Sequence, residues 1–206
     1  MRAGALHPTT LTLDTSAPTT ISPIVSRSLP GGIGYIKIVQ FTPDADKDFA
    51  AALASFGTDP KGLILDLRNT LGGLRAQTDA ETAIAARLTA APVLGYIETK
   101  GKKVQPITLT AGASVTYPIA VLVNAGTDNT AELLAAALQS KGAKLVGSKT
   151  FGDAGDVKLI TLRGQFGGGV GLKPDVLVPD TAGDEPLNRA VGVLSGRVAR
   201  LPSTRS

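Results

Sequence analysis

The sequence predicts an α/β protein with a mostly parallel sheet flanked by helices. Two short apolar runs, GLILDL (62–67) and PIAVLVN (118–124), are typical of strands that are buried on both faces. Helical patterns separate the predicted strands along the chain. Because parallel neighbours need a crossover connection, this alternation favours a parallel sheet covered by helices.

The first elements follow from local patterns. Residues 9–30 are rich in Thr, Ser and Pro and predict an extended lead-in with room for one edge strand. IGYIKIVQF (33–41) is β-branched and apolar, as strands are. Pro43 and Asp44 then open an amphipathic helix that ends near Phe56. The strand 62–67 leads into a Gly-containing turn at 68–74.

The second half of the chain repeats the alternation. We expect an Ala-rich helix at 76–89, followed by a hairpin of strands at 92–98 and 103–109. A buried strand at 118–124, a helix at 130–141 and a short strand at 143–147 come next. A further strand at 157–162, an irregular Gly-rich stretch at 167–180 and a helix at 184–197 complete the pattern. We divide the chain into a lead-in (1–30), an α/β core (31–180) and a C-terminal helix and tail (181–206).

Composition excludes several kinds of chemistry. The chain has no Cys, and its one His is His7, near the N-terminus. Ser-His-Asp triads, Cys-His dyads and zinc sites built on Cys or His are therefore not expected in the core, and we predict no cofactor or metal. The net charge is +4, but Lys and Arg are scattered and aromatics make up only 4%. We therefore expect neither nucleic-acid binding nor membrane insertion.

Two loops carry the candidate site. RNTLGG follows the strand 62–67 and NAGTDNTAE follows 118–124, and ligand sites in such folds lie at the carboxyl ends of parallel strands. Their glycines allow main-chain N–H groups to point at a ligand oxygen, and Asp128, Asn129 or Thr130 can cap the helix that begins there. Together the loops could form an oxyanion hole. On spacing alone, plain strand-to-helix turns remain the simpler interpretation.

Four segments carry a resemblance to a known family. IGYIKIVQF, GLILDLRNTLGG, PIAVLVNAGTDNTAELLAAALQSKGAKLVGSKTFG and GLKPDVLV together resemble the catalytic core of the C-terminal-processing (tail-specific) serine peptidases, over roughly residues 9–180. The resemblance implies a ClpP- or crotonase-like architecture, a polypeptide or peptide C-terminus as partner, and an extracytoplasmic bacterial location. The start of the chain lacks the apolar stretch of a signal peptide, so the sequence itself leaves the compartment open.

The family motifs can be transferred position by position. Its second segment runs Gly-Ser-Ala-Ser-Ala-Ser-Glu, with the middle Ser as nucleophile, and its third runs Thr-Phe-Gly-Lys-Gly, with Lys as general base. By resemblance, Gly72 and Gly73 match the oxyanion-loop glycines, while Glu132 and Thr150 match the residues beside the dyad. The nucleophile position is Asn129 and the base position is Asp153.

These two substitutions close the usual route to catalysis. Asn has no nucleophilic oxygen that a base can activate, and Asp, with an unperturbed pKa near ~3.9, is a weak base at neutral pH. A Ser–Lys dyad works because a desolvated Lys deprotonates the hydroxyl. We therefore expect an inactive homologue, a pseudopeptidase that retains a peptide-binding or assembly role.

Two alternatives stay open at this point. Thr127 lies two residues before Asn129 and Lys149 four before Asp153, so a shifted Thr–Lys dyad would make an active peptidase. The chain could instead be a structural module that forms homo-oligomers through 76–110. Asp128, Glu132, Asp153 and Asp156 match no metal signature, and we interpret them as solvated loop charges.

The family usually places a PDZ domain before this core. In this chain only TTLTL (9–13) resembles the strand that leaves such a domain, and we expect a core without a PDZ domain. A short Gly-rich link, 163–171, also replaces a longer family segment.

Overall fold

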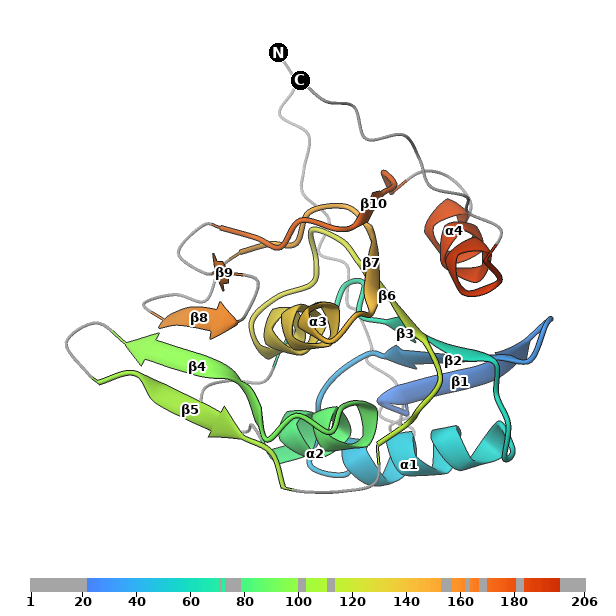
Figure 1. Cartoon of the computed structure of the whole chain (residues 1–206), viewed down its shortest axis with the longest axis horizontal. Helices are drawn as coiled ribbons and strands as arrows, with labels where there is room; N and C mark the ends of the chain where they lie inside the picture. The colour runs from blue at the N-terminus through green and yellow to red at the C-terminus, as the bar shows by residue number, and fades with distance from the viewer. Residues whose placement is uncertain are drawn as a thin grey trace, which may run out of the picture.

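The computed structural model describes residues 22–70, 72, 79–99, 103–110, 114–152, 157–161, 164–166, 170–180 and 184–196 (Figure 1). The elements in chain order are β1 (Ile24–Leu29), β2 (Ile33–Ile38), α1 (Ala45–Ser55), β3 (Gly62–Asp66), α2 (Asp79–Leu88), β4 (Val93–Thr99), β5 (Gln105–Thr108), β6 (Ile119–Val123), α3 (Thr130–Ser140), β7 (Lys144–Gly147), β8 (Val157–Thr161), β9 (Gly164–Phe166), β10 (Val176–Leu177) and α4 (Glu185–Leu194).

The larger sheet is mostly parallel, as predicted. Its strand order is β1-β2-β3-β6-β7-β10, and every neighbouring pair is parallel except β1 with β2. β1 is the edge strand for which the predicted lead-in left room. The crossovers from β2 to β3 and from β6 to β7 run through α1 and α3, the connections that parallel pairing demands.

Alternating side chains give this sheet two apolar faces. Ile36, Leu65 and Val121 belong to one core cluster, together with residues of α1, α2 and α3. Tyr35, Ile64 and Leu122 point the other way and pack with α4. Figure 1 shows α4 on the side of the sheet away from α1 and α3. This double burial explains why strands such as β3 lack a polar face.

A second, antiparallel sheet was not predicted. Its order is β5-β4-β8-β9, and it combines the predicted hairpin of β4 and β5 with β8, a strand from much further along the chain. The sheet lies beside α3, which contacts both β4 and β8 (Figure 1). The predicted strand 157–162 corresponds to β8 and is confirmed, but its partner was not foreseen.

Most predicted boundaries hold within a few residues. The strand predicted at 33–41 ends at Ile38, and the helix predicted at 184–197 is described from Glu185 to Leu194. The stretch 167–180, predicted as irregular, contributes the two-residue strand β10 to the sheet edge. No helix in the described part of the chain is long and apolar enough to cross a membrane.

Candidate functional site

The two predicted loops meet at the carboxyl ends of the parallel strands of the larger sheet. Asp66 at the end of β3 pairs in register with Leu122 near the end of β6, so the segments that follow leave the sheet side by side. The Gly72 N–H donates to the Asp128 carbonyl (3.2 Å), and the Asp128 N–H donates to the Thr70 carbonyl (3.2 Å). The loops are therefore joined by main-chain hydrogen bonds just before α3 begins.

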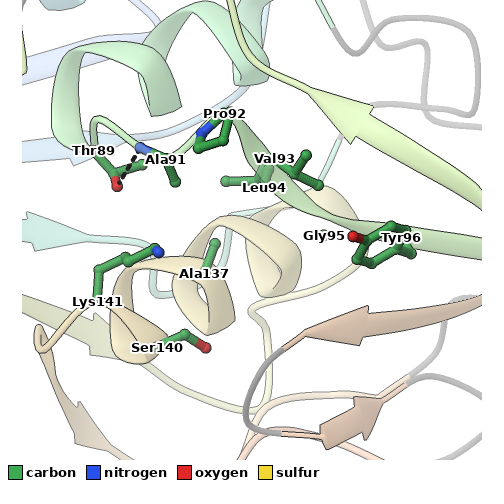
Figure 2. A pocket seen from close by; sticks show the side chains of 10 residues that line it. All are labelled: Thr89, Ala91, Pro92, Val93, Leu94, Gly95, Tyr96, Ala137, Ser140 and Lys141. Carbon is green, nitrogen blue, oxygen red and sulfur yellow. Dashed lines mark hydrogen bonds between the residues drawn. The ribbon is translucent and has the colours of Figure 1, made fainter.

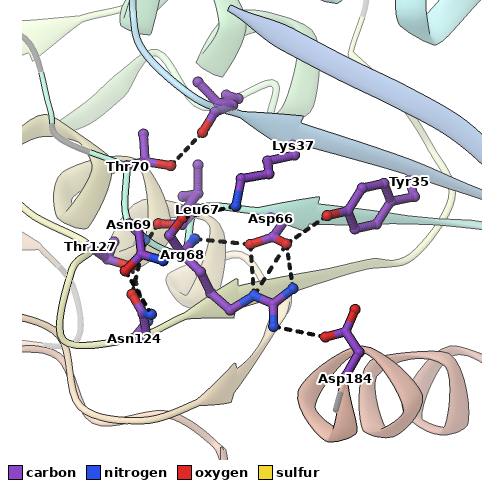
Figure 3. A network of polar contacts seen from close by, with 11 residues as sticks. Tyr35, Lys37, Asp66, Leu67, Arg68, Asn69, Thr70, Asn124, Thr127 and Asp184 are labelled. Atoms are coloured by element: carbon purple, nitrogen blue, oxygen red, sulfur yellow. Dashed lines mark hydrogen bonds and ion pairs between the residues drawn. The ribbon is translucent and has the colours of Figure 1, made fainter. Parts of the chain in front are cut away.

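A pair of asparagines fixes the distance between the loops. The Asn69 N–H donates to Asn124 Oδ1 (3.0 Å), and Asn124 Nδ2 donates to Asn69 Oδ1 (3.1 Å; Figure 3). Asn124 Oδ1 also accepts the Gly126 N–H (3.0 Å). A Cβ at Gly126 would collide with Asn69 Oδ1, so glycine is required there. Sequence reasoning missed this pair, although an Asn near the end of each buried strand was a visible signal.

Thr127 and Lys149, the residues of the alternative dyad, have different surroundings. The Thr127 hydroxyl is fully buried, donates to the Leu67 carbonyl (2.7 Å) and accepts the Asn124 N–H (3.0 Å). Lys149 is exposed. These hydrogen bonds favour a role of Thr127 in shaping the turn, and the alternative dyad stays a prediction.

Asn129 occupies a strained position at the start of α3. Its φ of 52° and ψ of −123° lie outside the regions that side-chain-bearing residues prefer. A sharp strand-to-helix turn of this kind presents the nucleophile in several hydrolases. The side chain does not cap the helix as predicted; Nδ2 donates to Asp128 Oδ2 (2.9 Å), and the main-chain N–H donates to Asp128 Oδ1 (2.6 Å).

Gly72 takes part in the contact between the loops. Its N–H donates to the Asp128 carbonyl, and its role in an oxyanion hole stays a prediction. A Cβ at this position would collide with the Thr130 nitrogen and the Asn129 Cβ. Glycine is therefore needed for the close approach of the two loops. Gly73 lies outside the described residues.

Glu132 anchors the turn at 150–152 to α3. The carboxylate is fully buried, and its Oε1 accepts the Thr150 hydroxyl and the Gly152 N–H (3.0 Å). Its Oε2 is buried with no hydrogen-bond partner. Burial raises the pKa of Glu132 from 4.5 to about 6, since hydrogen bonding by Thr150 and by the main chain of Gly152 and Asn129 only partly offsets it and the charge of Asp128 adds to it. Asp153, the next residue after this turn, lies outside the described residues.

The raised pKa of Glu132 predicts an unusual pH dependence of stability. Between pH 4.5 and about 6 the folded protein binds this proton more tightly than the unfolded chain does, so the free energy of unfolding falls as pH rises. The 1.5-unit shift corresponds to about 2 kcal/mol at neutral pH. In Glu132→Gln this decline should be absent.

Urea unfolding of both proteins at pH 4.5 and pH 7 measures the difference directly. The stability of the Gln variant relative to the parent should improve by about 2 kcal/mol between the two pH values. Glu185→Gln, on the exposed face of α4, should retain the parent's decline. If the free energy of unfolding changed equally with pH in the parent and in Glu132→Gln, Glu132 would not be the buried proton acceptor.

A charged network lies at the end of β3, where the loop RNTLGG begins. Asp66 is fully buried and accepts hydrogen bonds from the Tyr35 hydroxyl (2.7 Å) and from Arg68 Nη2 (2.6 Å; Figure 3). Arg68 Nη1 also donates to Asp184 Oδ1 (2.8 Å), just before α4. Burial opposes ionisation of Asp66, but the bonds from Arg68 and Tyr35 outweigh it and hold the pKa below its ordinary value. Burial, together with the Asp66 carboxylate, raises the pKa of Tyr35.

Within the described ranges, no group of three or more His, Cys, Asp or Glu side chains is arranged to hold a metal ion.

The fold and the site define a class. A parallel sheet flanked by helices, with a glycine loop meeting a strained strand-to-helix turn at a helix N-terminus, is the architecture of a hydrolase core. The profile of peptidase family S41 matches residues 32–178. The chain belongs to this family.

Individual relatives agree with this assignment. The chain is 33% identical over 210 residues to a carboxyl-terminal-processing protease of Synechocystis sp., covering 98% of this chain and 47% of the relative. It is 32% identical over 182 residues to the carboxy-terminal processing protease CtpA of Bacillus subtilis, covering 79% and 39%. The chain thus spans less than half the length of these curated relatives.

Solved structures show the same fold. The photosystem II D1 C-terminal processing protease superposes with a TM-score of 0.65 at 26% identity, covering 78% of this chain and 49% of that chain. A lipoprotein from Streptococcus agalactiae superposes with a TM-score of 0.66 at 21% identity, covering 85% and 70%. The second likeness concerns the fold alone.

Proposed function

We propose that this chain is a pseudopeptidase of family S41, a core that binds polypeptide segments without cleaving them. The observation that carries the proposal is the state of Asn129. It occupies the strained turn at the start of α3, where the resemblance to the family places the nucleophilic serine, and its amide is bonded to Asp128. An amide at this position supplies no oxygen that a base can turn into a nucleophile.

Three features of the neighbouring residues support the proposal. The sequence has Asp153 at the position where the family resemblance places the base, and the Thr127 hydroxyl is buried and bonded. Among the described residues, Glu132 Oε2 has no hydrogen-bond partner. The Gly72 N–H is used within the loop contact.

Peptide binding is supported by exposed apolar side chains beside the same turn. Phe151 and Val170 are 56% and 54% exposed. The Phe151 N–H donates to the Thr127 carbonyl (3.1 Å), and Gly152 packs against the main chain of Val170 and Gly171. An aromatic ring held on a rigid main chain is a suitable anchor for a peptide side chain. The names of the relatives favour the C-terminal part of a polypeptide as the partner.

The proposal predicts binding without turnover. Fluorescently labelled unstructured peptides with a free or an amidated C-terminus should stay intact during prolonged incubation and should raise fluorescence anisotropy on binding. Phe151→Ala should weaken binding by about fivefold, since truncating an interface anchor costs about 1 kcal/mol or more. Val25→Ala, an exposed apolar residue on the edge strand β1, serves as the matched control and should bind normally.

Two outcomes would replace the proposal. Hydrolysis that is abolished both by Thr127→Ala and by Lys149→Ala would establish an active peptidase with a shifted dyad. A defined oligomer by light scattering, without affinity for any of the peptides, would favour an assembly role for the 76–110 region.

A further inference from the structure

A cavity lies at the end of α3 that is far from Asn129. Its volume is about 470 Å³, within the range of small-molecule sites, and it opens between β4 and the last turn of α3 (Figure 2). α3 runs from Thr130 to Ser140, so the cavity and the strained turn are separated by about 15 Å of helix. The cavity is therefore distinct from the proposed peptide site.

The walls of this cavity are mainly carbon. Pro92, Val93 and Leu94 line one side and Ala137 the other. Three hydroxyls lie in the lining, and two of them are engaged: Thr89 Oγ1 accepts the Ala91 N–H (3.2 Å; Figure 2), and Ser140 Oγ donates to the Ala136 carbonyl (2.9 Å). The third belongs to Tyr96, which is 43% exposed. An occupant therefore gains chiefly by burying apolar surface.

Local sequence explains why space remains here. The pairing of β4 with β5 shifts register between Val93 and Gly95, so the strand is irregular where it passes α3. The helix presents Ala137, whose side chain is a single methyl group, and Gly95 presents none. Small groups on the helix and an irregularity in the strand leave a gap that larger side chains would fill.

A lysine stands at the boundary of this cavity. Lys141 is exposed, and no acidic partner for it occurs in the part of the chain that the structure describes. In Figure 2 its side chain extends from the end of α3 toward the segment of Thr89 and Ala91. A second cavity of about 450 Å³ adjoins the first and shares Thr89 and Lys141 with it. Its lining is more polar and includes Ser114 and Thr116.

We propose that the two cavities together bind an amphiphile with one apolar tail and an anionic head. The tail lies against Val93, Leu94 and Ala137, and the head, a carboxylate or a phosphate, meets the Lys141 ammonium at the junction. The carbonyls at the end of α3 oppose an anion only weakly, because those of Leu138 and Gln139 accept the N–H groups of Ala143 and Gly142. The inference does not depend on whether the Asn129 site binds or cleaves peptides.

Calorimetric titration of the full chain tests the class of ligand. Dodecanoate and dodecyl phosphate, kept below their micellar concentrations, should bind with one-to-one stoichiometry, and the tighter of the two identifies the head group. Dodecyltrimethylammonium should bind at least tenfold more weakly. Equal affinity for the cationic and anionic amphiphiles, or no binding of either anion, would overturn the proposal.

Two substitutions test the position of the ligand. Lys141→Glu replaces attraction by repulsion and should weaken binding of the anions about tenfold, whereas Lys144→Glu, an exposed lysine of β7 outside the lining, should change it less than twofold. Ala137→Leu should fill the tail cavity and abolish binding. Equal losses in both lysine variants, or full affinity in a folded Ala137→Leu protein, would place the ligand elsewhere.

Discussion

Replacing Asn129 by Ser together with Asp153 by Lys should produce a peptidase from this chain. We expect hydrolysis of unstructured peptides at least a hundredfold above the parent protein, because a positioned general base alone contributes about 10²- to 10⁴-fold. Each single replacement restores only half of the dyad and should stay at the parent's level. Cleavage of a quenched fluorescent peptide measures the effect.

The surrounding frame is the reason for expecting a gain. The backbone at position 129 already has the strained conformation of a strand-to-helix elbow, and Ser is smaller than the Asn it replaces. The Gly152 N–H donates to Glu132, so the described chain reaches the buried carboxylate one residue before position 153. Glu132 Oε2, which has no hydrogen-bond partner, can then accept the ammonium and orient it.

A control separates catalysis by the dyad from a contaminating activity. Asn129→Ala with Asp153→Lys carries the lysine without a hydroxyl and should be inert, and only the Ser–Lys variant should be labelled by a fluorophosphonate. An inert Ser–Lys variant that melts like the parent would show that the frame itself is no longer competent. We would then attribute the loss of activity first to the hydrogen bond between the Gly72 N–H and the Asp128 carbonyl, which occupies this N–H.

The sequence was sufficient to predict the parallel sheet and the meeting of the two loops. GLILDL and PIAVLVN are typical of strands buried on both faces, and their carboxyl ends lie side by side as expected. The antiparallel sheet could not be predicted in the same way. β4 and β8 lie far apart along the chain, and neither strand carries a local signal that selects the other as its partner.

The details of the site depended on main-chain geometry, which residue types do not encode directly. Asn129 has a positive φ where its loop meets Gly72; Asn tolerates positive φ better than most residues, but its type alone does not select this position. Likewise, Thr127 suits a nucleophile by type alone, whereas its hydroxyl is buried in the turn.

One overlooked residue had a clear signal. Asp66 is the only charged residue in the apolar run GLILDL, and a charge in a doubly buried strand needs a partner. Arg68, two residues later, is that partner. Tyr35 on the neighbouring strand donates a further hydrogen bond to Asp66. The network lies beside the loop that holds Asn69 (Figure 3).

Removing the charge of Asp66 should therefore be the most destabilising of the substitutions considered. In Asp66→Asn the Arg68 guanidinium, only 16% exposed, loses the carboxylate that neutralises it, and one Asn oxygen cannot replace the hydrogen bonds made by two carboxylate oxygens. Breaking a buried pair in this way costs about 3–5 kcal/mol. Urea unfolding at pH 7 measures the loss.

The other end of the network provides the matched control. Asp184 also bonds Arg68 but is 44% exposed, so Asp184→Ala should cost about 1 kcal/mol or less. The pKa of Asp66 lies below its ordinary 3.8, so its contribution to the free energy of unfolding is present above about pH 4 and is lost on acidification. The difference in the free energy of unfolding between Asp66→Asn and the parent should therefore become smaller below that pH. Faster hydrogen exchange at the Asn69 and Gly126 amides in Asp66→Asn, but not in Asp184→Ala, would show that the buried charge also holds the loops together. A loss below about 1 kcal/mol in Asp66→Asn would mean that the Arg68 guanidinium is solvated and that the asparagine pair holds the loops without it.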